Sequence, residues 1–107
     1  MSKINVELVT PEKLVLSKDV DMVVIPGSDG DFGVLANHSP VISSIRPGVV
    51  QLEEGSEKQK IFISGGFAEV TGERCTILAT ESKDVTNADA SEIENMINAA
   101  IAFGQEK

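Results

Sequence analysis

A glycine-rich segment that contains two aspartates, residues 26–33, has the residue types that could hold a phosphate or a metal ion. It is neither a GxGxxG motif nor a P-loop, because no Lys-Ser/Thr pair follows it. Asp29 and Asp31 are spaced like the first ligands of a calcium loop, but the further oxygen ligands and the closing glutamate of an EF-hand are missing. We therefore expect a multi-turn connection whose glycines adopt positive φ, or a protein-contact loop built on one, and no metal.

Three other residues could act as nucleophiles or bases. His38 and Ser39 are neighbours, and neighbouring side chains on an extended segment point in opposite directions, so a shared proton is not expected. The GxSxG nucleophile motif is absent, and we expect His38 to be hydrogen-bonded locally or across an interface. Cys75 has no CxxC partner and is expected to be a small core residue. A small hydrolase or sugar-binding enzyme is the least favoured hypothesis.

Composition narrows the classes of partner. The 107 residues carry a formal charge of −8, which repels phosphate backbones and anionic lipid, so no nucleic-acid partner is expected. A single histidine and a single cysteine cannot build a cluster of metal ligands or an internal disulfide. The apolar runs are far shorter than the ~20 residues of a membrane span. We expect a soluble cytoplasmic protein with one core, no direct membrane span and no cofactor.

Alternating apolar and polar residues dominate the first eighty positions, and turn residues interrupt them every 8–12 residues or so, which is typical of a sandwich or a barrel. Pro26 and Gly27 are expected to end the third strand. We place a β-sandwich domain at residues 1–85 and a helical segment at 86–107. The predicted strands cover residues 4–8, 14–16, 20–25, 49–52, 60–63, 68–70 and 75–79.

A helix is expected after Val85. Ser91 and Glu94 have the spacing of a capping box, and Gly104 is a plausible end. A helix of about three turns is marginal in water, so it must pack on the sandwich or on a partner. Its apolar stripe consists of Ile93, Met96, Ile97, Ala100 and Ile101.

Several motifs occur in an order that resembles a known family. They are VTPE at residues 9–12, PGSDGDFGVLANHSP at 26–40, PGVV at 47–50, GGFAEV at 65–70 and ILA at 77–79. Together they resemble the epsilon subunits of bacterial F-type ATP synthases, which are called delta in mitochondria. The resemblance spans residues 3–83.

The resemblance implies a mainly β fold, a flattened antiparallel β-sandwich of two five-stranded sheets followed by a short C-terminal α-helix. It also implies a non-catalytic subunit of the central rotor, which binds the gamma subunit and sits on the c-ring. Such a subunit couples proton flow to ATP synthesis at the cytoplasmic face of the bacterial inner membrane. A generic cytoplasmic β-sandwich module for protein interactions is the alternative.

The resemblance also assigns partner-interface residues. Asp31 matches the acidic position that faces the basic loop of the ring. The residues that match the ring-end loop are Gly30, Asp31, Phe32 and Gly33, and those that match the segment close to ring and shaft are His38, Ser39 and Pro40.

The sequence departs from the family in two places. Ala36 and Asn37 stand where Pro-Gly is common, which should alter only the local turn. About 20 residues follow Val85, enough for one helix, whereas relatives usually carry two that can inhibit ATP hydrolysis. Residues 85–90 also lack the arginine of the family's ATP-binding motif. We therefore expect neither ATP binding nor inhibition by a helical hairpin.

Overall fold

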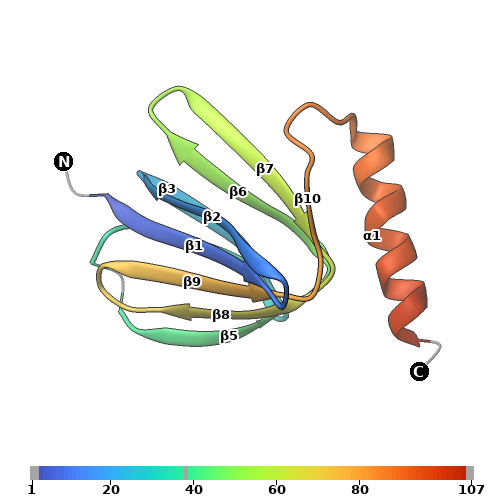
Figure 1. Cartoon of the computed structure of the whole chain (residues 1–107), viewed down its shortest axis with the longest axis horizontal. Helices are drawn as coiled ribbons and strands as arrows, with labels where there is room; N and C mark the ends of the chain where they lie inside the picture. The colour runs from blue at the N-terminus through green and yellow to red at the C-terminus, as the bar shows by residue number, and fades with distance from the viewer. Residues whose placement is uncertain (1–2, 38, 106–107) are drawn as a thin grey trace.

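The computed structural model describes residues 3–37 and 39–105, and it shows a strongly curled β-sheet with one helix beside it (Figure 1). The strands are β1 (Ile4–Thr10), β2 (Lys13–Val20), β3 (Met22–Gly27), β4 (Gly30–Val34), β5 (Val41–Ile45), β6 (Gly48–Glu54), β7 (Glu57–Ile63), β8 (Gly66–Val70), β9 (Arg74–Ala79) and β10 (Ser82–Asp84), and the helix is α1 (Ala90–Gln105).

The sheet folds over itself into two halves of five strands. One half has the order β10-β7-β6-β3-β4 and the other β5-β8-β9-β1-β2. Among the described residues the two halves are joined by a single backbone pair, Gly27 with Ile45. The expected β-sandwich with one C-terminal helix is confirmed. One pairing differs from the expected antiparallel arrangement, because β1 and β9 run parallel.

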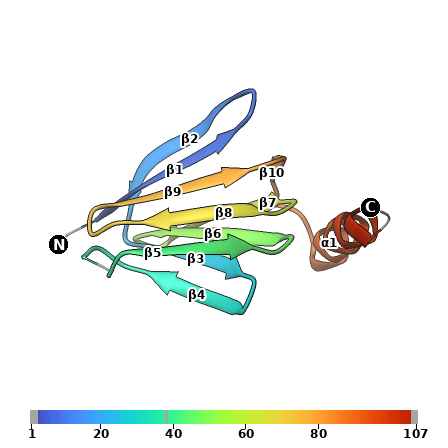
Figure 2. The ribbon, with the colours of Figure 1, turned by 90° about the horizontal axis from the view of Figure 1, so that it is seen from below.

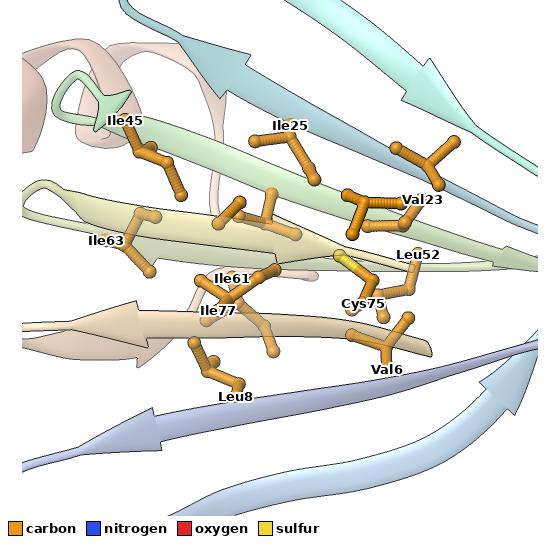
Figure 3. Packing of buried hydrophobic residues seen from close by; sticks show 14 of the residues in the cluster. Val6, Leu8, Val23, Ile25, Ile45, Leu52, Ile61, Ile63, Cys75 and Ile77 are labelled. Atoms are coloured by element: carbon orange, nitrogen blue, oxygen red, sulfur yellow. The ribbon is translucent and has the colours of Figure 1, made fainter. Parts of the chain in front are cut away.

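The core lies between the two halves and is built by period-two alternation. In β1, for example, Ile4, Val6 and Leu8 are buried, while the residues between them face outward. Figure 3 shows Leu8 and Ile77 of one half facing Ile25 and Ile63 of the other. Each such side chain contributes about 1.5–3 kcal/mol when it is fully buried.

The strand predictions were right for the apolar alternations and wrong where glycine or serine interrupts them. β4, β5 and β10 were not expected, and Val20 ends β2 instead of opening β3. Pro26 does not stop β3, because the carbonyl oxygen of Pro26 still accepts a hydrogen bond from the Arg46 N–H at 3.0 Å. The strand pairs with β6 only as far as Val24, so the missing N–H of Pro26 interrupts no ladder bond there.

Helix α1 begins two residues earlier than the capping box predicts. The N-cap is Asp89, whose Oδ1 accepts a hydrogen bond from the Glu92 N–H at 2.8 Å, whereas Ser91 lies inside the helix. The apolar stripe is confirmed but its docking is shallow: Ile93 and Ile97 are half-buried, and Ile101 is 41% exposed. The helix lies beside the sandwich and is not embedded in it (Figure 1).

Candidate functional site

The glycine-rich segment forms a tight hairpin between β3 and β4, not a multi-turn connection. Gly27 pairs with Gly30 across a two-residue turn. Gly30 has the expected positive φ, 134°, whereas Gly33 lies in regular strand. Gly27 is required for a different reason, since a Cβ there would lie 2.9 Å from the ring of Phe32. Phe32 packs against the core, so it anchors the hairpin to the sandwich.

Asp31 lies on the outer side of this hairpin and is held by Arg46. Its Oδ1 accepts a hydrogen bond from Nη2 of Arg46, and the two side chains are 60% and 45% exposed. Nη1 of the same guanidinium donates to the carbonyl oxygen of Gly27 at 2.6 Å. The Ser28 N–H also donates to the carbonyl oxygen of Ser44 at 2.9 Å. The hairpin is therefore tied to the end of β5 at several points.

The other expected interface residues lie elsewhere. Ser39 and Pro40 are exposed in the connection between β4 and β5, and His38 lies outside the described residues. β4 runs from the hairpin to the other end of the sandwich, where the Asn37 N–H donates to the carbonyl oxygen of Gly72 at 2.6 Å. The structure thus places Gly30 and Asp31 at one end of the strands and Ser39 and Pro40 at the opposite end (Figure 2).

A row of exposed apolar side chains crosses the outer face of the half that contains β5 and β8, and sequence reasoning missed it. Leu14 pairs with Val9, Val9 with Leu78, and Leu78 with Phe67, so the four side chains form one line across four strands. Leu14, Leu78 and Phe67 are 54%, 52% and 57% exposed. The sequence does carry a signal, because Leu78 and Val9 are apolar at positions where the alternation points outward. We call these four residues the apolar row.

The apolar row lies close to the turns at the end of the sandwich that carries the β3–β4 hairpin. A shallow hollow lies against it, formed with Pro11, Gly66 and Thr80. A second hollow separates α1 from the outer face of β3 and β6, and its lining includes Asp31 and Arg46. Both hollows are open to solvent, so the end of the sandwich presents broad, shallow surfaces that fit a protein better than a small molecule.

Perturbed ionisable groups lie away from the hairpin. Burial raises the pKa of the Cys75 thiol to about 12, which keeps it protonated and a poor nucleophile at neutral pH. Hydrogen bonds from the backbone N–H and hydroxyl of Thr86 lower the pKa of Asp84. A hydrogen bond to Glu54 raises the pKa of Lys3, which it joins at 2.8 Å. Lys3 and Asp84 make bonds that hold the chain together locally, whereas Cys75 fills the core.

Within residues 3–37 and 39–105 no three His, Cys, Asp or Glu side chains come together as metal ligands. In the same part of the chain, no helix has both the length and the apolar character needed to cross a bilayer.

Comparison with known proteins identifies close relatives. Residues 3–84 match the family model described as the β-sandwich domain of the ATP synthase delta/epsilon chain. The ATP synthase epsilon chain of Parvibaculum lavamentivorans is 48% identical over 99 residues, which are 92% of this chain and 75% of the relative. The ATP synthase epsilon chain of Rhodospirillum rubrum is 47% identical over 95 residues, which are 88% of this chain and 71% of that one.

Two solved assemblies contain a chain with a similar fold. In the mitochondrial ATP synthase of Euglena gracilis, a structure of OSCP, F1 and c-ring, the matching chain has a TM-score of 0.78 and 27% identity. The match covers 95% of this chain and 66% of that one, slightly less than two thirds. In the central stalk and c-ring of the Tetrahymena thermophila mitochondrial enzyme, a chain with 18% identity and a TM-score of 0.68 shares the fold, over 85% of this chain and 73% of that one.

Proposed function

The chain belongs to the ATP synthase delta/epsilon family, and we propose on this basis that it is a non-catalytic subunit of the central rotor that joins the gamma subunit to the c-ring. In this role it couples proton flow to ATP synthesis without binding substrate itself. Its place is the cytoplasmic face of the bacterial inner membrane, where the complex holds it peripherally.

The apolar row is the observation that carries the proposal. Three of its four side chains are more than half exposed in the isolated chain, although each is large and apolar. Exposed apolar surface of this kind is stabilised when a permanent protein partner covers it. We assign the apolar row to the gamma subunit, because the exposed carboxylate of the hairpin is the better match for basic loops of the c-ring.

The β3–β4 hairpin is the proposed contact with the c-ring. Asp31 is exposed at the hairpin end of the sandwich, and the resemblance matches it to a position that faces basic ring loops. The apolar row lies near the same end, so one end of the sandwich would meet both partners. A net charge of −8 favours a basic protein surface over anionic lipid as the docking site.

We propose a role separate from that of the hairpin for the segment that contains His38, Ser39 and Pro40. Because Ser39 and Pro40 lie at the end opposite the hairpin, they cannot share one small contact with Asp31. We propose that this connection faces the shaft formed by gamma, beside the turn that contains Gly72. Substitutions in the hairpin are therefore expected to affect the c-ring, and substitutions at Ser39 or Pro40 the gamma subunit.

Binding of the purified chain to purified rotor components tests the proposal. The full chain is immobilised and exposed in turn to the gamma subunit, to the detergent-solubilised c-ring, and to the two together. We expect gamma to bind alone and the c-ring to be retained more strongly when gamma is present. Failure to retain gamma, alone or with the ring, would contradict the proposal and leave an interaction module for some other protein.

A further inference from the structure

Arg46 connects to the hairpin through three hydrogen bonds that reach both of its strands. Its Nη1 donates to the carbonyl oxygen of Gly27 on β3, and its Nη2 donates to the carboxylate of Asp31 on β4. Its backbone N–H donates to the carbonyl oxygen of Pro26 at 3.0 Å. Arg46 itself directly follows β5, so these bonds join the hairpin to the other half of the sandwich.

Backbone pairing gives the hairpin little other support at this end. β4 lies at the edge of the sheet and, among the described residues, pairs only with β3. β3 pairs with β6 at residues 22–24 and with β5 at Gly27 alone. Ile25 and Phe32 pack in the core, so the seam with β5 positions mainly the turn of the hairpin, and Arg46 supplies most of the bonds at that seam.

We propose that Arg46 is a positioning residue, which holds the β3–β4 hairpin in the shape in which it meets its partner. The planar guanidinium of arginine offers several donors in a fixed geometry and stays charged at every accessible pH. It can therefore serve a carbonyl oxygen and a carboxylate at once, whereas the single ammonium of lysine is a point charge. This inference rests on the proposed role of the hairpin as the contact with the c-ring.

The bridge also defines what Asp31 offers to a partner. Oδ1 is engaged by Arg46, so a cation on the partner would bind through the second carboxylate oxygen. At long range the positive charge of Arg46 offsets the negative charge of Asp31. The carboxylate therefore acts on a partner mainly at contact distance. Recognition at the hairpin then depends on geometry, which is what Arg46 fixes.

Amide hydrogen exchange on the isolated full chain tests the positioning role without any partner. The Ser28 N–H is the reporter, because it donates to Ser44 across the seam. In Arg46→Met we expect its exchange to be about tenfold faster, as is typical when a hydrogen bond to a charged group is lost. Arg46→Lys should give a smaller increase. The matched control is Arg74→Met, at the opposite end of the sandwich, where Arg74 and Glu7 are 3.9 Å apart.

The positioning role would be overturned if the Ser28 amide of Arg46→Met exchanged at a rate within twofold of that in the unchanged protein. This conclusion would hold whether or not ATP synthesis by the complex changed. Circular dichroism and exchange of the core amide of Ile77 check that each variant is folded.

Proton-driven ATP synthesis by the reconstituted complex provides the second readout. We expect a loss in Arg46→Met that exceeds the loss in Asp31→Asn, since the first variant releases the turn of the hairpin and the second removes one charge. Faster exchange of Ser28 with unchanged ATP synthesis would show that the hairpin is ordered by Arg46 but is not the contact. That outcome would overturn the proposed use of the hairpin while the binding of gamma remained.

Discussion

Phe67 lies directly opposite Leu78 on neighbouring antiparallel strands, and both side chains are more than half exposed on the outer face of the sandwich. Cross-strand pairs of this kind stabilise a sheet by about 0.2–1 kcal/mol even when they face water. Yet strand positions that face solvent usually carry polar residues. Their apolar character is therefore better explained by a partner that covers them than by the stability of the isolated chain.

Leu78→Asp should abolish stable binding of gamma while leaving the sandwich folded. The side chain is 52% exposed, so the cost to the free energy of unfolding should stay within about 1 kcal/mol. Calorimetric titration with gamma measures the affinity. Thr76→Asp, two residues away on the same strand and face, is the control and should bind nearly as well as the unchanged chain. Equal losses in both variants would show that the apolar row is not the specific contact.

Asp31→Lys should weaken proton-driven ATP synthesis and leave the fold intact. The substitution places a second cation beside Arg46, so the hairpin loses a bond and gains a repulsion. Exposed pairs contribute only about 0.2–1 kcal/mol, so the melting temperature should fall little. Asp19→Lys serves as the control, since Asp19 is an exposed carboxylate at the far end of the sandwich, bonded to Asn5. Unchanged synthesis with normal assembly would show that Asp31 is only a strand residue.

Gly66→Ala should destabilise the sandwich by about 2–4 kcal/mol. Gly66 has a φ of 153°, and a Cβ there would overlap the carbonyl oxygen of Leu78 on the neighbouring strand. Urea denaturation gives the free energy of unfolding. Gly72→Ala, whose Cβ would meet nothing within 4 Å, should differ from the unchanged chain by less than about 1 kcal/mol. A similar small change at Gly66 would mean that β8 and β9 can separate at no cost.

The stability of the protein should fall at alkaline pH because of Cys75. Burial raises the pKa of its thiol from 9.0 to about 12, so the unfolded chain loses this proton at a lower pH than the folded protein. Between these values the free energy of unfolding should fall as pH rises, by up to about 1.4 kcal/mol per pH unit. The slope is measured against Cys75→Ala, which lacks the thiol. Parallel pH profiles for the two proteins would contradict the prediction.

Asp89→Ala should reduce the helicity of α1, because the helix loses its N-cap at a typical cost of about 1 kcal/mol. Ellipticity at 222 nm reports the change. Ser91→Ala should leave the helicity unchanged or raise it slightly, since alanine is the better helix former inside a helix. The opposite result would restore Ser91 as the cap.

Local alternation was enough to predict the strands that fill the core. Cys75, Ile77 and Ala79 alternate with outward residues, and all three are buried as expected. Local alternation misses β4, because its sequence, GDFGV, is poor in strand formers and predicts a loop. Its place in the sheet depends on pairing with β3 and on the ring of Phe32, which anchors it to the core.

The candidate site could be predicted only in part. The residues of the hairpin were found through the family resemblance, but the bridge from Asp31 joins β4 to Arg46, the residue after β5, and no local pattern reveals this contact. The separation of Asp31 from Ser39 follows from the direction of β4, which had not been expected as a strand at all. The apolar row appears only when the register of four strands is known.

The parallel pairing of β1 with β9 has a consequence for how the protein is made. Val6 lies beside Cys75, which is 69 positions later in the chain (75 minus 6). A ribosome that adds about 5–20 residues per second needs roughly 3–14 seconds to produce the partner strand after β1. During this interval β1 can pair with β2 but keeps its other edge open, and open edges invite contacts with other nascent chains. Completion of the sheet is thus a late event in translation, and the first strand of the protein is among the last to gain its full set of neighbours.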